Sequence, residues 1–216
     1  MSISSASASL AALLRRDVAA FNCTTAGPRV EAPLDLRNTD LRGADLRLAN
    51  LDSADLTSAD LGGADLRGAQ LTSVVLEAAN LQGAQLGGAT LTFCNLVGAD
   101  LSHADLTGAT LKFTRLENAE LSGAHFNDAH AEGCDSSRVN AIGTHFDGAE
   151  LKDVLLNFAR LAGSSFHHAR LTACSFIEAD LTEASFEDAT LSDCTDMNSF
   201  ASGISFTPNK KGSQKQ

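Results

Sequence analysis

Leucine recurs every five residues through most of this chain. In the stretch LRGADLRLANLDSADLTSADLGGADL, residues 41–66, leucine stands at positions 41, 46, 51, 56, 61 and 66. A five-residue step matches neither the 3.6-residue period of a helix nor the two-residue period of a strand. Neither element could place these leucines on one face, so the period must belong to the architecture as a whole.

The frame continues without a slip from Leu36 to Leu191, which gives 32 positions at steps of five. The leucine position, called i below, is Leu or Phe everywhere except at Ala131, Ser136 and Ala141. Position i−2 is small or slim, mostly Ala, and position i−1 is usually polar, often Asp or Asn. A self-similarity this long is typical of a repeat protein.

The pattern A-[D/N]-L-X-X, as in ADLTS, ADLGG and ANLQG, resembles the pentapeptide-repeat family over about residues 34–195. The resemblance implies an all-β solenoid, a right-handed quadrilateral β-helix in which four pentapeptides make one square coil of about 20 residues. Positions i and i−2 would then point inward, and positions i−1, i+1 and i+2 would face water. At a strand spacing of ~4.8 Å, the 32 repeats predict about eight coils and a rod of roughly 38 Å, or eight to nine coils with a degenerate last one.

Residues 20 apart should stack in columns along such a rod. Phenylalanine occupies one inward column, at Phe126, Phe146, Phe166, Phe186 and Phe206. We expect these rings to form a ladder in the core, with a ninth, degenerate coil reaching about residue 206. Glycine recurs at position i+2, the third residue of a four-residue corner, where a type II turn requires positive φ.

The chain divides into three regions. Residues 1–33 are predicted to be a leader with a short N-terminal capping helix, because 8–22 place Leu10, Leu13, Leu14, Val18 and Phe21 on one side. Residues 34–206 form the expected β-helix, and residues 207–216 an expected disordered basic tail. The start of the chain shows no secretion signal or membrane span, which predicts a cytoplasmic protein.

Negative charge dominates the surface. The chain has 27 acidic and 16 basic residues, a formal net charge of −11, which argues against direct nucleic-acid binding. Two outward columns are acidic and form a candidate acidic face: Asp40, Asp60, Asp100, Glu120 and Asp180 in one, and Asp45, Asp65 and Asp105 in the other. This surface is either a solvated face or a charged rod that imitates DNA.

Apolar residues at outward positions gather within about one third of the circumference. They form a candidate partner edge: Phe93, Phe113, Val75, Val97, Leu155, Phe158 and Ile177. Exposed apolar clusters on soluble proteins often mark a partner surface, although incidental packing of corner side chains is the alternative.

The stretch 129–146 is irregular, because Ala131, Ser136 and Ala141 remove core volume from one coil. His125, His130 and His145 lie nearby, and surface histidines are favoured over a metal site because no further ligand is well placed. No nucleophile with a neighbouring base is recognised, so we expect neither an enzyme nor a bound cofactor.

Four of the five cysteines share one inward column: Cys94, Cys134, Cys174 and Cys194. The odd number and the spacing argue against a disulfide framework and a zinc site. We expect buried thiols in place of Ala, with a Cys174–Cys194 disulfide as the less favoured alternative.

Two functions remain open. The first is a non-catalytic, rigid scaffold that binds an unidentified protein partner. The second follows from the resemblance: members of the quinolone-resistance type protect DNA gyrase by imitating duplex DNA. This chain departs from them because its repeats are Leu-rich and regular, without projecting loops. An enzyme with chemistry in the irregular coil is the least favoured possibility, and two rods could form a homodimer through an open end coil.

Overall fold

The computed structural model describes residues 12–14, 16–18 and 33–195. Parallel bridges join residues 20 apart, from Asp35 with Asp55 to Ser175 with Thr195, in eight steps along the rod. The chain is therefore an all-β solenoid with 20-residue coils, as predicted. The expected ninth coil with Phe206 and the tail 207–216 lie outside the described residues.

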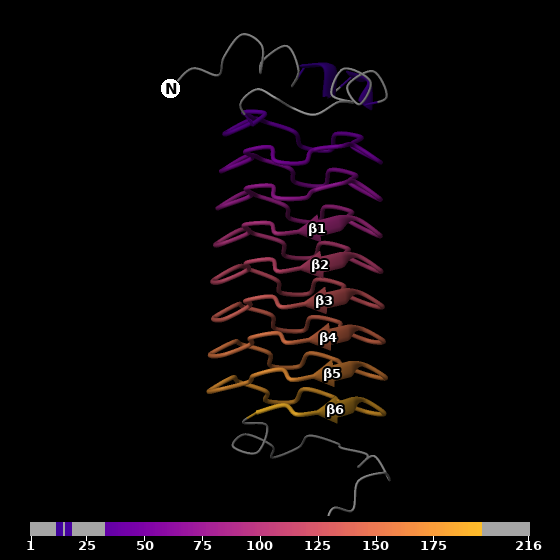
Figure 1. The fold of residues 1–216 in the computed structure, drawn as a ribbon, viewed down its shortest axis with the longest axis vertical. Coiled ribbons are helices and arrows are strands. Elements are labelled where there is room, and N and C mark those ends of the chain that lie inside the picture. The colour runs from indigo at the N-terminus through magenta and orange to yellow at the C-terminus, as the bar shows by residue number, and fades with distance from the viewer. Residues whose placement is uncertain (1–11, 15, 19–32, 196–216) are drawn as a thin grey trace, which may run out of the picture.

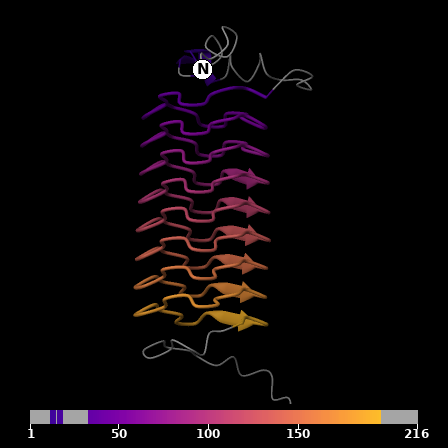
Figure 2. The ribbon, with the colours of Figure 1, turned by 90° about the vertical axis from the view of Figure 1, so that its left-hand side faces the viewer.

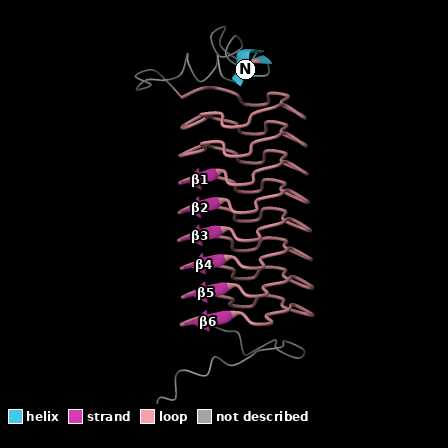
Figure 3. Ribbon diagram, turned by 90° about the vertical axis from the view of Figure 1, so that its right-hand side faces the viewer, coloured by secondary structure: helices cyan, strands magenta, loops and turns pink. Residues whose placement is uncertain are grey.

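Six three-residue strands stack on one side of the rod (Figures 1 and 3). They are β1 (Thr90–Thr92), β2 (Thr110–Lys112), β3 (His130–Glu132), β4 (Glu150–Lys152), β5 (Arg170–Thr172) and β6 (Thr190–Ser192). They form one parallel sheet in chain order, and each residue pairs with the one 20 positions later. Seen from the other side, the coils repeat the same outline along the rod (Figure 2).

All corners share one backbone conformation. The residue at position i+2 has φ between 51° and 70° at 12 glycines and 20 other residues. The predicted role of glycine is confirmed, but the coil imposes the left-handed conformation on bulky residues too, including Phe93 and Phe113. Such residues are uncommon in this region, so the surrounding hydrogen bonds must hold the corners in place.

Backbone hydrogen bonds between coils follow a fixed rule. Leu41 N donates to Asp60 O (2.7 Å), and Asp60 N donates to Thr39 O (2.9 Å). The amide at i+2 also donates to the next coil, and most corners are closed by a bond such as Ala44 N to Leu41 O (3.1 Å). Where the corner is closed in this way, these bonds use four of the five amides in the repeat, and the amide at i+1 is left over.

The side chain at i−1 provides a partner for that remaining amide. Asp100 Oδ1 accepts from Ser102 N (2.9 Å), and Asn80 Oδ1 accepts from Gln82 N (3.0 Å). The same bond is made by Asp35, Asp40, Asp45, Asn50, Asp55, Asp60, Asp65, Asn95, Asp105, Asp135 and Asp180. A buried N–H without a partner is costly, so the Asp or Asn of the consensus stabilises the corner.

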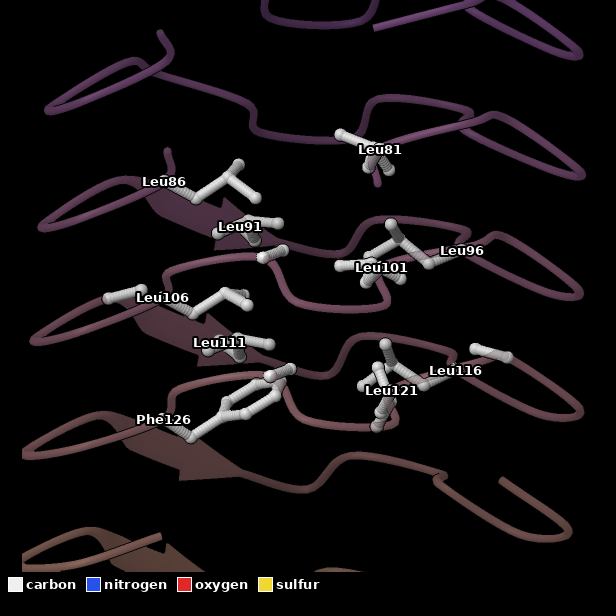
Figure 4. Packing of buried hydrophobic residues seen from close by; sticks show 14 of the residues in the cluster. Leu81, Leu86, Leu91, Leu96, Leu101, Leu106, Leu111, Leu116, Leu121 and Phe126 are labelled. Carbon is white, nitrogen blue, oxygen red and sulfur yellow. The ribbon is translucent and has the colours of Figure 1, made fainter. Parts of the chain in front are cut away.

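Leucines and alanines fill the interior as predicted. Figure 4 shows the leucines of successive coils pointing into the solenoid, where Leu81, Leu101 and Leu106 are at most 1 % exposed. Along the phenylalanine column, the ring centroids of Phe126 and Phe146 are 5.2 Å apart. The centroid distance is 4.7 Å between Phe146 and Phe166 and 4.5 Å between Phe166 and Phe186. These distances confirm the ladder within the described residues.

The irregular coil keeps most of its core volume, contrary to expectation. An internal cavity of about 30 Å³ lies beside Ala131 and Ser136, lined also by Phe126 and Phe146. These rings occupy the positions that flank the three small residues along the chain, and they help to line the space that remains. The coil is therefore underfilled by little more than one buried water's share of space.

Part of the predicted capping helix is described, with helical residues among 12–18 at the N-terminal end of the rod. Leu14 is fully buried in the hydrophobic core, and the partly buried Leu13 and Val18 pack against this core. This supports the capping role, while Leu10 and Phe21 lie outside the described residues. No helix within the described residues is long and apolar enough to cross a membrane.

Candidate protein-interaction surfaces

Phe93 and Phe113 form an exposed aromatic pair at two stacked corners. Their ring centroids are 5.4 Å apart with an interplanar angle of 12°, and the side chains are 59 % and 52 % exposed. The ring of Phe113 lies over Gly133, where an added Cβ would come within 2.6 Å of Cδ1. The missing side chain at Gly133 leaves room for the ring to lie along the rod.

The other residues of the candidate partner edge do not continue this pair. Leu155, Phe158 and Ile177 are exposed and form a separate cluster, here called the Leu155 cluster, whereas Val75 and Val97 are only half-exposed. Arg115 and Asp135 lie between Val75 and Leu155 in the same column. The guanidinium of Arg138 covers Phe158 at 5.1 Å from the ring centroid. The Phe93–Phe113 pair is thus the more open of the two surfaces.

Two further exposed apolar side chains were missed by sequence reasoning. Leu48 is 70 % exposed at an i+2 corner, and Ile142 is 36 % exposed on another face. Leu48 obeys the same positional rule as Phe93, so the repeat frame alone could have revealed it. It lines a groove of about 700 Å³ with Val18 of the capping segment and with Arg47 and Arg67.

The acidic face divides into a neutralised part and an unneutralised part. Arg42 bonds Asp40 (2.8 Å) and lies 3.4 Å from Asp60 in the next coil. Arg47 makes the same bridge between Asp45 and Asp65, with distances of 2.6 and 3.6 Å. The columns were predicted to be acidic throughout, and the D-L-R spacing is the sequence signal for the arginines that neutralise them.

The middle of the acidic face carries charge that no described cation pairs. Asp100, Asp105 and Glu120 have no ion pair among the described residues, yet each accepts a hydrogen bond from the amide two residues later. Glu120 also accepts from Asn140 Nδ2 (2.7 Å). Negative charge and corner geometry are therefore coupled in these three side chains.

The cysteine column has a structural explanation that the sequence did not provide. The i+3 amide does not close the described corners that begin at Leu71, Leu91, Leu111, Leu151 and Leu171. The side chain one coil further on donates to the carbonyl of the leucine that begins the corner, as Cys94 Sγ does to Leu71 O (2.6 Å) and Cys134 Sγ to Leu111 O (3.4 Å). Thr114 serves Leu91 O in the same way. Cys94, Thr114, Cys134, Cys174 and Cys194 make this bond, whereas Val74 and Val154 in the same column carry no donor. The bond is therefore frequent in this column but not required.

All four of these cysteines are free thiols. Burial raises the pKa of Cys94 to about 12 and also raises the pKa of Cys134. Both thiols are therefore protonated at neutral pH, in agreement with the expected role of a small core residue.

The structure places two serines beside histidines, although the sequence pattern predicted no nucleophile with a neighbouring base. Ser165 Oγ lies 3.3 Å from His145 Nδ1, and Ser185 Oγ lies 2.7 Å from His167 Nε2. Asp147 Oδ1 lies 3.8 Å from His167 Nδ1. This last distance exceeds a hydrogen bond and the imidazole of His167 is 40 % exposed, so the aspartate does not orient the ring as a catalytic triad requires. The arrangement at His167 is a solvated Ser–His pair.

The histidines near the irregular coil lie as surface groups. The rings of His125 and His145 stack with centroids 4.9 Å apart, and His130 pairs with Glu150 at 3.2 Å. Among the described residues, no group of three or more His, Cys, Asp or Glu side chains converges on a possible metal position.

Together, the four-cornered coils, the inward Leu and Ala columns and the parallel ladder define a class, the right-handed quadrilateral β-helices. The family model described as "Pentapeptide repeats" matches the chain in eight copies, over residues 35–68, 54–92, 69–108, 84–123, 119–157 and 159–195. The chain belongs to the pentapeptide-repeat family.

Solved structures of the family are similar to the chain in different degrees. HetL, a pentapeptide repeat protein involved in heterocyst differentiation regulation from Nostoc sp. strain PCC 7120, is 25 % identical, with 86 % of this chain and 92 % of HetL covered and a TM-score of 0.48. QnrB1, a plasmid-mediated fluoroquinolone resistance protein, is 18 % identical, with 73 % and 91 % covered and a TM-score of 0.50. At this identity QnrB1 shows a shared fold alone. No curated protein matches the chain.

Proposed function

We propose that this protein is a non-catalytic scaffold that binds a protein partner through the Phe93–Phe113 pair. The observation that carries the proposal is the stacking of two largely exposed phenyl rings on neighbouring corners. Aromatic side chains are large apolar anchors in protein interfaces, and they are rarely left in water without a use.

The corners also hold the pair in place before any partner binds. Phe93 N donates to Lys112 O and Phe113 N donates to Glu132 O, both at 2.8 Å. The backbone of each ring is thereby fixed in the parallel ladder, so little backbone ordering remains to oppose association. A rigid aromatic pair suits a partner with a complementary apolar slot.

Capture from the native cell tests the proposal, with wild-type protein and a Phe93→Ser/Phe113→Ser variant as baits. Because both positions are outward, the double variant should fold normally and lose at least about tenfold in affinity, the loss expected when aromatic anchors are removed. Leu48→Ser is the matched control, because it removes an exposed apolar side chain from the same corner position in another column.

Retention of the same partner by the double variant, with loss in the control, would contradict the proposal. Binding through the rings should also persist at high salt, since apolar contact is not screened.

The second candidate is protection of DNA gyrase by DNA imitation. The unneutralised carboxylates of Asp100, Asp105 and Glu120 favour it, whereas the arginine bridges at Asp40 and Asp45 weaken it. A supercoiling assay with fluoroquinolone separates the two candidates. The variant Asp100→Asn/Asp105→Asn/Glu120→Gln removes charge but keeps the amide acceptors, so loss of protection in this variant alone would favour DNA imitation over the Phe93–Phe113 pair.

A further inference from the structure

Cys174 and Cys194 face each other in the last two described coils. They occupy the same inward column, and the residues that follow them, Ser175 and Thr195, form a parallel bridge. Thr195 N donates to Cys174 O at 3.0 Å, which fixes the two backbones in register. Neighbouring parallel strands lie about 4.8 Å apart, within the Cα separation of roughly 4.4–6.8 Å that disulfides span.

The two thiols differ in exposure. Cys174 is buried, whereas Cys194 is half-buried, and Cys94 and Cys134 in the same column are both buried. Among the four described cysteines, only Cys194 can therefore meet a reagent from solution while a neighbouring thiol stays within reach behind it. This is the arrangement of an attacking thiol and a resolving thiol.

Hydrogen bonding between the pair supports this division of roles. Hydrogen bonding between the two sulfur atoms lowers the pKa of Cys194 to about 7 and raises the pKa of Cys174. Each sulfur also lies near a carbonyl of the preceding coil, Cys174 Sγ at 3.5 Å from Leu151 O and Cys194 Sγ at 3.6 Å from Leu171 O. The thiolate is the nucleophilic form of cysteine, so a large fraction of Cys194 is reactive at neutral pH. The pKa values of Cys94 and Cys134 are raised by burial instead.

We propose that Cys194 and Cys174 form a thiol modification site that reacts with small-molecule disulfides such as oxidised glutathione. The Cys194 thiolate attacks one sulfur of glutathione disulfide, forms a mixed disulfide and releases one glutathione thiolate. Cys174 loses its proton to solvent and attacks Cys194 Sγ, which forms the Cys174–Cys194 disulfide and releases the second glutathione. The two protein thiols are oxidised by two electrons, and one glutathione disulfide is reduced to two thiols.

The product would join the last described coil covalently to the coil before it. The modification therefore acts on the last described coil and leaves the Phe93–Phe113 pair unaltered.

The test incubates the full chain with oxidised glutathione near pH 7 and follows it by intact mass and peptide mapping. Wild-type protein should lose the mass of two hydrogen atoms and two titratable thiols, and one crosslinked peptide should contain Cys174 and Cys194. Cys174→Ala should stop at a mixed disulfide on Cys194, and Cys194→Ala should not react at Cys174. Cys134→Ala, a buried thiol of the same column, is the matched control and should behave as wild type.

A persistent mixed disulfide in wild-type protein, comparable reaction at Cys94 or Cys134, or a crosslink from Cys194 to Cys23 would overturn the proposal. A second measurement stays informative if oxidation is slow. Alkylation of Cys194 by iodoacetamide at pH 7 should be slowed on the order of tenfold in Cys174→Ala, because the thiolate loses its donor. An unchanged rate in that variant would equally overturn the proposal.

Discussion

At the scale of single residues, the polar position i−1 does more than keep the surface wet. Asp100 accepts from Ser102 N at 2.9 Å, and Ser102 is only 8 % exposed. The amide would otherwise be nearly buried without a partner, since the ladder and the corner use the other four amides of the repeat. Acidity on this family member's surface is therefore partly a by-product of satisfying the backbone.

This interpretation predicts a difference between two substitutions at one position. Asp100→Ala should lower the free energy of unfolding by about 1 kcal/mol, because the amide of Ser102 loses its acceptor. Asp100→Asn keeps the acceptor and removes repulsion from Glu120, so it should change stability by less than about 0.5 kcal/mol. Urea unfolding measures both, and equal destabilisation by the two variants would show that charge, not the hydrogen bond, matters at this corner.

At the scale of the coil, the irregular stretch 129–146 encloses only a small cavity. Phe126 and Phe146 flank the three small residues along the chain, and a cavity of about 30 Å³ remains. At about 24 cal/mol per Å³ of cavity, this space lowers stability by roughly 0.7 kcal/mol. Filling it can stabilise the coil only with a small side chain.

Ala131→Val should raise the free energy of unfolding by up to about 0.7 kcal/mol, the whole of the cavity cost. A larger side chain should exceed the space, so Ala131→Phe should destabilise by about 1–3 kcal/mol. Ala129→Val is the matched control, because Ala129 is fully buried but does not line the cavity. Chemical unfolding compares the three, and destabilisation by Ala131→Val as severe as in the control would show that no usable space exists.

The repeat frame predicted much at this scale, including the inward columns, the phenylalanine ladder and the left-handed corner. Two things escaped it because they depend on contacts between coils. The corners of the cysteine column accept a bond from a side chain of the following coil, as at Cys94 and Leu71, 23 residues apart. The small size of the space beside Ala131 and Ser136 depends on how the side chains around it pack, which the repeat pattern does not contain.

The candidate surfaces were predictable in membership and less so in extent. Phe93 and Phe113 follow directly from an apolar residue at an outward position. Their separation from the Leu155 cluster depends on Arg115 and Asp135, which lie between Val75 and Leu155 in one column. It also depends on the partial burial of Val75 and Val97. That burial is set by packing, which a pattern of outward positions does not contain.

At the scale of the whole molecule, charge pairing is uneven along the rod. Arg37, Arg42 and Arg47 each bond an aspartate in the first coil and lie within 3.6 Å of an aspartate in the second. These pairs join the first two coils on three sides. The D-L-R spacing recurs once more, at Arg67, and not in the C-terminal half.

The uneven pairing predicts a graded response to acid. Hydrogen bonds from Arg37 and Arg47 lower the pKa of Asp35 and Asp45 to about 2. Because the folded-state pKa lies below the unfolded value of about 3.9, this stabilisation is complete above pH 3.9 and is lost as the pH falls toward 2. Protection against amide exchange should therefore fall first at Leu36 and Leu46, whose amides join these coils.

Leu156 and Phe166 are the matched controls, because their amides make the same ladder bond far from the arginines. After correction for the intrinsic pH dependence of amide exchange, protection at Leu36 and Leu46 should fall between about pH 4 and pH 2, while protection at Leu156 and Phe166 persists. Simultaneous loss of protection along the rod would show that the arginine pairs do not govern acid stability.

The unbroken 20-residue register also makes the rod a ruler. Removing or duplicating 20 residues would shorten or lengthen the distance between two surface features by one coil and leave their bearings around the axis unchanged. An insertion of five residues would instead turn everything beyond it by a quarter of a revolution. A relative could thus change the distance between two binding surfaces by inserting or deleting whole coils. To change the angle between them around the axis, it would have to insert or delete single five-residue repeats.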